Sequence, residues 1–167
     1  MATTALIDTK TVERRRLRFN SLSEVIAEAE RLAAAEKAGK VTRLGNWTTG
    51  QIFNHLASWA NYPYDGYPSQ LGNPPWFIKL FLKFQKNKFI NGGMPQGIHI
   101  PRVTGGTVGT EPMGVDEGLE KLRASLTRLE AGPPSIPNPI FGAISHHEWK
   151  NINMRHAELH LGYLKPG

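Results

Sequence analysis

The chain of 167 residues carries 20 Lys and Arg against 14 Asp and Glu, which gives a formal net charge of +6 at pH 7, and it contains no cysteine. This length suits a single domain over residues 1–167, and the lack of cysteine excludes disulfide scaffolds, thiol nucleophiles, iron–sulfur clusters and Cys-ligated zinc. No apolar run approaches the roughly 20 residues of a membrane span, and the N-terminus has no hydrophobic signal core, so we expect a cytoplasmic protein without stable membrane insertion.

The dense basic run of the chain is Arg14-Arg15-Arg16-Leu17-Arg18. A few excess positive charges are common in cytoplasmic proteins. A nucleic-acid-binding protein would present a basic face with interleaved aromatic residues, or a groove-reading motif. Neither is evident in this sequence, so we expect no nucleic-acid partner.

The first of four predicted core helices covers about residues 21–38. Ser21 and Glu24 have the spacing of a capping box, in which each side chain bonds to the backbone of the other residue and so starts the helix. Apolar residues then recur at helical spacing, and Gly39 ends the segment.

The second core helix is predicted over about residues 48–61. Thr48 and Gln51 repeat the capping-box spacing. Pro63 is expected to end this helix, because proline lacks a backbone N–H and its ring clashes with the preceding turn.

The following segment, residues 63–114, differs from the rest in composition, since it holds 9 of the 17 glycines and 7 of the 12 prolines. Such long loops are uncommon in compact domains and are often functional when ordered. Within it, residues 75–90 are predicted to form a short extra helix with aromatic residues on one face and lysines on another. This helix could cover a substrate pocket, pack across a homodimer or lie on an anionic membrane surface, and we favour the first two.

The third core helix, about residues 116–131, has leucines at helical spacing, and the fourth, about 146–164, begins with a capping box at Ser145 and Glu148. The predicted fold is therefore all-α. It is a four-helix bundle with a long Gly/Pro-rich crossover, carrying the short extra helix, between the second and third core helices. A crossover of this length allows those two helices to run parallel.

Three of the six histidines lie on predicted apolar helix faces. His55 shares a face of the second helix with apolar residues, and His156 and His160 do so on the fourth, one turn apart. Burying three imidazoles without partners would cost roughly a few kcal/mol of desolvation. A divalent metal ion such as zinc, nickel or iron would remove that cost. Three protein ligands leave positions open for water or substrate.

The alternative is that these histidines are core residues bonded to backbone carbonyls or water. The segment from His156 to His160 reads H-x-E-x-H and not the H-E-x-x-H of zinc proteases. Glu158 lies about 200° around the helix from each histidine, so we expect it to point away from the ion, toward solvent or behind a ligand. The glycine-rich stretch 104–109 lacks the lysine and following helix of a phosphate-binding loop and is predicted to be a flexible turn.

Three stretches, at residues 14–19, 47–56 and 141–164, resemble the DinB/YfiT-like superfamily, in a poorly characterised branch of it. Together they span nearly the whole chain. The last is the most specific, because the family ends in H-x-x-x-H followed by a small x-Gly-x-aliphatic tail, here His156-Ala157-Glu158-Leu159-His160-Leu161-Gly162-Tyr163-Leu164.

The resemblance implies a four-helix bundle in which one histidine of the second helix and two of the last hold a divalent metal ion. In this sequence these are His55, His156 and His160, the same three that the periodicity selects. Related sequences often show Arg-Gly-Gln after the final ligand, where this chain has Leu161-Gly162-Tyr163, so no role of that Arg or Gln is carried over. Characterised relatives include thiol-dependent S-transferases and a maleylpyruvate isomerase. The resemblance therefore implies metal activation of a low-molecular-weight thiol or another small polar substrate.

We therefore expect a metal-dependent enzyme acting on a small molecule, with thiol-dependent transfer or isomerisation as the leading hypothesis. No catalytic base is assigned. Tyr163, on the helix face that carries both histidines, is predicted to bind substrate, with a purely core role as the alternative. Two other functions stay open: a non-catalytic metal-binding or stress-associated protein, and a membrane-surface interaction protein whose histidines belong to the core.

Overall fold

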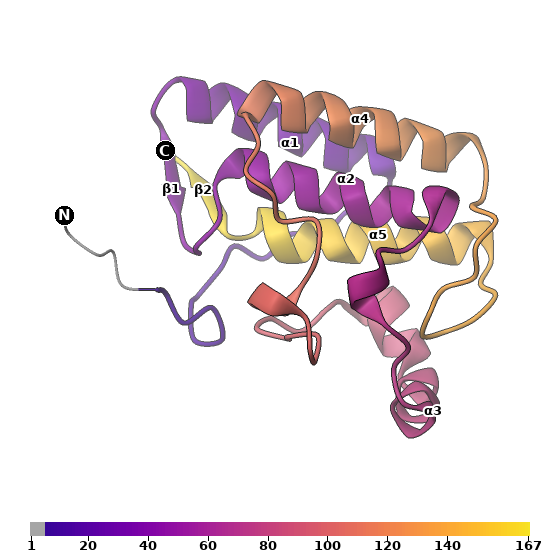
Figure 1. The fold of residues 1–167 in the computed structure, drawn as a ribbon. Coiled ribbons are helices and arrows are strands. Elements are labelled where there is room, and N and C mark those ends of the chain that lie inside the picture. Colours follow the sequence, from indigo (N-terminus) through magenta and orange to yellow (C-terminus); the bar gives the residue numbers. More distant parts are fainter. Residues whose placement is uncertain (1–5) are drawn as a thin grey trace.

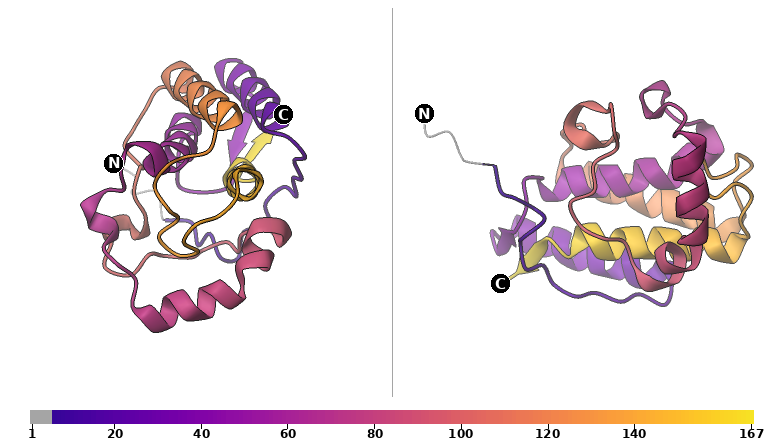
Figure 2. Two further views of the ribbon diagram at one scale, coloured as in Figure 1. Left: turned by 90° about the vertical axis from the view of Figure 1, so that its right-hand side faces the viewer. Right: turned by 90° about the horizontal axis from the view of Figure 1, so that it is seen from below.

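The computed structural model describes residues 6–167 and is mostly helical, as predicted (Figure 1). Four long helices lie side by side, with α1 and α4 on one side and α2 and α5 on the other (Figures 1 and 2). They are α1 (Leu22–Lys37), α2 (Thr49–Asp65), α4 (Val115–Ala131) and α5 (His146–Leu161). The apolar core between them includes Val25, Leu32, Phe53, Leu122, Leu129 and Leu161.

A small antiparallel sheet, which the all-α prediction omitted, lies at one end of the long helices (Figure 1). Strand β1 (Val41–Arg43) pairs with β2 (Leu164–Pro166). The predicted fourth helix extended to residue 164, but α5 ends at Leu161 because the chain turns there to form β2. Three-residue strands of this kind carry no sequence signal, since alternation needs more residues to become visible.

The predicted capping residues start three of the helices. In α2 and α5 both halves of the capping box are formed, between Thr48 and Gln51 and between Ser145 and Glu148. At α1 the Ser21 hydroxyl accepts from the Glu24 backbone N–H at 3.2 Å. These caps fix the residues at which α2 and α5 begin. The position of each histidine around its helix axis follows from that start.

The expectation that Pro63 ends the second helix is wrong, since α2 continues to Asp65. Pro63 lies in the last turn of the helix, where its missing N–H removes a single backbone bond. The Gly66 N–H still donates to the Tyr62 carbonyl at 2.9 Å, and the Pro63 carbonyl accepts from the Ile136 N–H at 3.0 Å. The turn is therefore held at both of its ends.

Helices α2 and α4 run parallel, as the long crossover allows. Near their first turns, a Cβ at Gly118 would lie 2.8 Å from the Gly50 carbonyl oxygen, so only glycine permits this approach of the two backbones. Near their last turns, Arg128 pairs with Asp65 at 2.9 Å. The first turn of α2 therefore lies beside the first turn of α4, and the last turn of α2 lies beside the last turn of α4.

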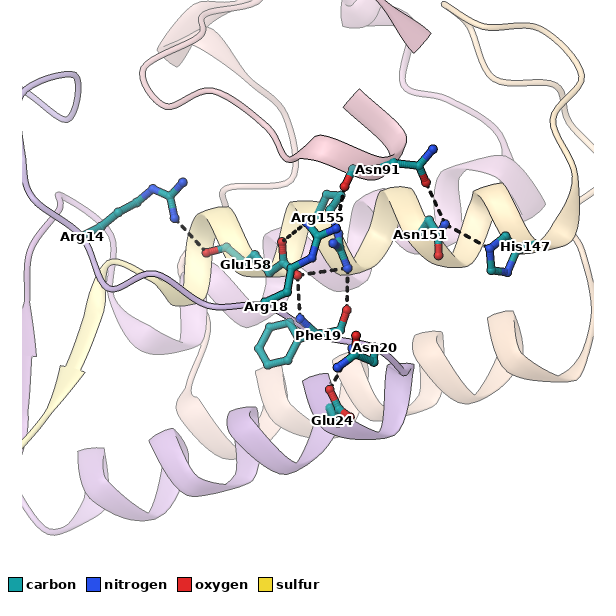
Figure 3. Close-up of polar contacts among 10 residues, drawn as sticks. All are labelled: Arg14, Arg18, Phe19, Asn20, Glu24, Asn91, His147, Asn151, Arg155 and Glu158. Atoms are coloured by element: carbon teal, nitrogen blue, oxygen red, sulfur yellow. Dashed lines mark hydrogen bonds and ion pairs between the residues drawn. The ribbon is translucent and has the colours of Figure 1, made fainter. Parts of the chain in front are cut away.

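The crossover forms several short helical pieces below the long helices in Figure 1. They are η1 (Ser69–Leu71), α3 (Trp76–Phe84), the π-helical turn η2 (Lys88–Gly92) and η3 (Thr104–Gly106). The predicted extra helix over 75–90 is thus α3 followed by a separate turn. Asn91 anchors this turn, because its side chain accepts from Asn151 at 3.2 Å and its carbonyl accepts from Arg18 at 2.6 Å (Figure 3). None of the helices among residues 6–167 is both long and apolar enough to cross a bilayer.

The N-terminal segment runs along α5 and is held there by the buried carboxylate of Glu158 (Figure 3). This carboxylate accepts the Phe19 backbone N–H at 2.7 Å and pairs with Arg155 at 3.1 Å. Arg155 in turn donates to the Phe19 carbonyl at 2.5 Å. The expectation that Glu158 lies toward solvent is wrong: it is 6% exposed, and burial raises the pKa of its carboxyl group.

Arginines of the basic run bond to the carboxyl end of α5 and to the strand β2 that follows it. Arg15 donates to the carbonyls of Leu164 at 2.6 Å and Leu161 at 3.2 Å, and Arg14 donates to the carbonyl of Glu158 at 3.2 Å. The last carbonyls of a helix have no partner within it, and positive charge stabilises this end of the helix dipole. These arginines therefore serve the fold.

Substituting Glu158→Gln keeps the size of the side chain but removes the charge that faces Arg155. Breaking one side of a buried ion pair costs about 3–5 kcal/mol, so we expect urea denaturation to show a decrease of about 3 kcal/mol in the free energy of unfolding. The control Glu130→Gln breaks the exposed pair with Lys150 and should cost less than about 1 kcal/mol. Equal decreases in the free energy of unfolding of the two variants would contradict a stabilising role of the buried Glu158–Arg155 pair.

Candidate metal centre

The structure brings together the three histidines that the sequence singled out. His55 comes from the middle of α2, and His156 and His160 come from the last two turns of α5. One ring nitrogen of each lies within 4.8 Å of those of the other two. The rings meet edge to face, with centroids 4.6–4.9 Å apart. Two helices that are remote in sequence thus present their imidazoles to one point.

These distances suit a shared metal ion. The Nε2 atoms of His55 and His156 are 3.1 Å apart. Two ligands of a tetrahedral ion with bonds of about 2.0–2.1 Å lie about 3.3 Å from each other. The Nε2 atoms of His55 and His156 therefore already have the separation of two ligands of one ion, and the nitrogen of His160 lies within 4.8 Å of both.

A backbone carbonyl of the crossover determines which nitrogen of His55 is free. The Nδ1 of His55 lies 2.9 Å from the Val108 carbonyl oxygen. A carbonyl only accepts, so Nδ1 carries the proton and Nε2 keeps a lone pair that faces His156. This is how outer partners orient metal-binding imidazoles in proteins.

Gly109 lets the crossover come close enough for this contact. Its φ is +73°, and a Cβ there would lie 2.9 Å from the Cβ of Ser58 and 3.0 Å from the Tyr62 hydroxyl on α2. A larger residue would therefore be strained and would push the loop away from α2. The stretch 104–109, predicted as a flexible turn, is an ordered support for His55.

Two tryptophans enclose the histidines. Trp47, directly before the cap of α2, stacks on His160 with ring centroids 5.2 Å apart and planes 13° from parallel. Its centroid is also 4.8 Å from that of His55. Trp59, one turn beyond His55, meets His156 edge to face at 6.0 Å. The Trp59 indole N–H is buried and has no hydrogen-bond partner within residues 6–167.

Burial keeps all three imidazoles neutral at pH 7. It lowers the pKa of His55 to about 4, against a smaller opposing effect of the Val108 carbonyl. The pKa values of His156 and His160 also fall well below the ordinary value, through burial and then through the neighbouring histidines. Neutral imidazoles are the form that binds metal.

The histidines form part of the wall of a cavity of about 450 Å³. Helices α2 and α5 and the crossover contribute to this wall, the crossover including Leu82 of α3 and Phe89 of η2. No residue that lines it, within the described part of the chain, is Asp, Glu, Lys or Arg. The aromatic lining residues are Trp47, Trp59, Tyr67, Phe89, Phe141, Trp149 and Tyr163. The lining is therefore mostly apolar, and its polar groups are the three clustered histidines, a further histidine of the crossover, His99, and a few Asn and Thr side chains.

Tyr163, the predicted substrate-binding residue, lies in this wall and is 8% exposed. Its hydroxyl donates to the Thr9 carbonyl at 3.0 Å, and burial raises its pKa. The ring therefore faces the cavity while the hydroxyl ties the N-terminal segment to the end of α5.

Sequence reasoning assigned no role to Trp47 or to Val108. Trp47 sits next to a strong helix cap, a position that could have marked it as a fixed aromatic residue beside His55. Val108 acts through its carbonyl, which no side-chain pattern can signal.

Comparison with known proteins gives a family but no function. A family model described as "Protein of unknown function (DUF1569)" matches residues 11–167. No curated protein and no solved structure matches the chain.

The buried histidines make the metal-free protein sensitive to acid. The folded-state pKa of His55 is about 4, below the ordinary 6.5, so the unfolded state takes up the proton first as pH falls. The free energy of unfolding should therefore decrease between pH 6.5 and 4, by about 3 kcal/mol from His55 alone. Urea denaturation in the presence of a chelator measures this. His55→Asn should lose that part of the slope, and equal profiles for wild type and variant would contradict the assignment.

Proposed function

The chain belongs to the DUF1569 family of proteins of unknown function, and we propose that it is a metal-dependent enzyme acting on a small molecule. The observation that carries this proposal is the convergence of three neutral imidazoles at one corner of a 450 Å³ cavity. Closed structural metal sites use four protein ligands, whereas sites with three leave a position for water or substrate. A cavity of this volume suits a small organic molecule.

We further propose that α1, α2, α4 and α5 form a DinB-like four-helix bundle. The origin of the histidines supports this, since one comes from the second long helix and two from the last. The parallel α2 and α4, joined by a long crossover, support it as well. The sequence Leu161-Gly162-Tyr163, which departs from the Arg-Gly-Gln of related chains, gives the carboxyl end of α5 an aromatic ring in the cavity wall.

His55, His156 and His160 would hold a divalent ion such as zinc, nickel or iron, because neutral imidazole suits all three metals. Such an ion supplies Lewis acidity and positive charge, which favour the anionic form of a nearby thiol. The Val108 carbonyl keeps the proton of His55 on Nδ1, and Trp47 restrains the ring of His160. The apolar wall leaves few polar groups near the histidines, and an apolar surrounding strengthens electrostatic interactions there.

The lining of the cavity favours a thiol with an apolar or aromatic body. Among residues 6–167, no lysine or arginine lines the cavity to pair with a carboxylate of the substrate. The substrate would instead be positioned by its sulfur atom at the histidines and by aromatic contacts, including the ring of Tyr163. The reaction we propose is thiol-dependent transfer or isomerisation.

A non-catalytic metal-binding role is the second candidate, and one observation favours it. No carboxylate or amine of the part of the chain that the structure describes lines the cavity, and these groups commonly act as general bases alongside histidine. A thiol that ionises at the metal would need no separate strong base, whereas hydrolysis would.

The metal site is tested by elemental analysis of tag-free protein. We expect close to one equivalent of metal in the wild type and at least a tenfold decrease in His55→Ala and His156→Ala, because each removes one of three ligands. The control His147→Ala removes an exposed histidine at the start of α5 and should retain the metal. A wild type that stays metal-free after incubation with zinc, nickel and iron would refute the site.

Turnover separates the two candidate functions. Metal-loaded protein should accelerate the transfer of an aromatic thiol to a small electrophile, and should use glutathione, which carries charged groups, at least tenfold less well. A chelator should abolish the rate and added metal should restore it. Full metal occupancy without turnover of any thiol would favour the non-catalytic role.

A further inference from the structure

Helix α3 exposes an unusual amount of apolar surface. Five of its nine residues are large apolar side chains that are 48–83% exposed, and none of its residues is buried. They are Trp76, Phe77, Leu80, Phe81 and Phe84. Figure 2 shows α3 standing apart from the four long helices. Contiguous exposed apolar patches of this kind mark interaction sites.

The exposed residues occupy one side of α3. At 3.6 residues per turn they cover an arc of about 140°. Leu82, which lines the cavity, lies outside this arc and faces the protein. Helix α3 therefore contributes one side to the cavity wall and presents the other to the surroundings.

Lysines border the apolar arc. Lys79 and Lys83 lie along one flank of the helix, and Lys88 follows in η2. Lys86 is directed elsewhere, since it pairs with Glu148 at 2.7 Å. The whole stretch 66–110 contains no Asp or Glu. Its charge is thus entirely positive around the apolar face.

We propose that α3 docks the protein on the surface of an anionic lipid bilayer. A short helix with bulky aromatic residues on one side and lysines beside them suits the interface, where rings enter the boundary between headgroups and acyl chains while ammonium groups meet lipid phosphates. The charge of the stretch complements anionic headgroups. This proposal is independent of the metal site and of any reaction there.

A second copy of the chain fits this face less well. Two α3 helices packed face to face would bring two acid-free, lysine-bearing segments together, and like charges oppose such contact. An anionic bilayer satisfies both the apolar arc and the lysines.

Co-sedimentation of the full-length protein with vesicles tests the proposal. We expect binding to phosphatidylglycerol vesicles that is at least tenfold stronger than binding to phosphatidylcholine vesicles and that weakens as salt is added. The double variant Trp76→Glu with Phe81→Glu should lose binding at least tenfold. The control Leu6→Glu changes another exposed apolar side chain, 87% exposed and outside α3, and should bind as the wild type does.

A second pair of variants tests the lysines. Lys79→Glu with Lys83→Glu should reduce binding to anionic vesicles severalfold, whereas Lys40→Glu with Lys165→Glu makes the same change of net charge far from α3 and should have a smaller effect. Circular dichroism checks that each variant is folded. Equal binding of both vesicle types, no binding at all, or concentration-dependent dimerisation that the α3 variants abolish would overturn the proposal, the last in favour of a second copy.

Discussion

The burial of three uncharged imidazoles between α2 and α5 is the constraint around which the site is organised. Each ring loses hydration when it is buried, and no acidic side chain from the described residues lines the cavity to compensate. The surroundings deal with this in three ways. The Val108 carbonyl satisfies one nitrogen of His55, Trp47 stacks on His160, and the remaining lone pairs are directed to one point where an ion can sit. The capped starts of α2 and α5 hold that geometry.

The crossover links this site to its surroundings. It supplies the carbonyl that orients His55, residues of the cavity wall such as Phe89, and the exposed face of α3. Its glycines make this possible: Gly109 approaches α2 in a conformation that other residues adopt only with strain. The four long helices thus fix the histidines, while the shape and polarity of the cavity depend largely on a segment that could vary without disturbing the core.

Periodicity and capping signals depend on residues a few positions apart, so they could be read from the sequence and predicted the long helices. The same periodicity selected the three histidines, because it placed each of them on an apolar helix face. The predictions that were wrong concern residues whose structure is determined by tertiary contacts. Pro63 stays helical because its turn is tied to Ile136, and Glu158 is buried because the N-terminal segment covers it. The arrangement of the crossover was not predictable, because a segment rich in glycine and proline can adopt many backbone conformations. Tertiary packing determines which of them forms. The same holds for Val108, whose contribution comes from a backbone atom.

The contact between the Glu158 carboxylate and the N-terminal segment has a consequence for biosynthesis. It joins Phe19, which precedes α1, to a residue 139 positions later, and Arg15 bonds to the carbonyls of Leu161 at the end of α5 and Leu164 in β2. None of these contacts can form until the last helix has left the ribosome. The first helix therefore emerges long before the helix that anchors its leading segment, and that segment has no partner on α5 during this interval. Contacts of such long sequence separation also slow folding, so assembly of the histidine site is a late step in folding.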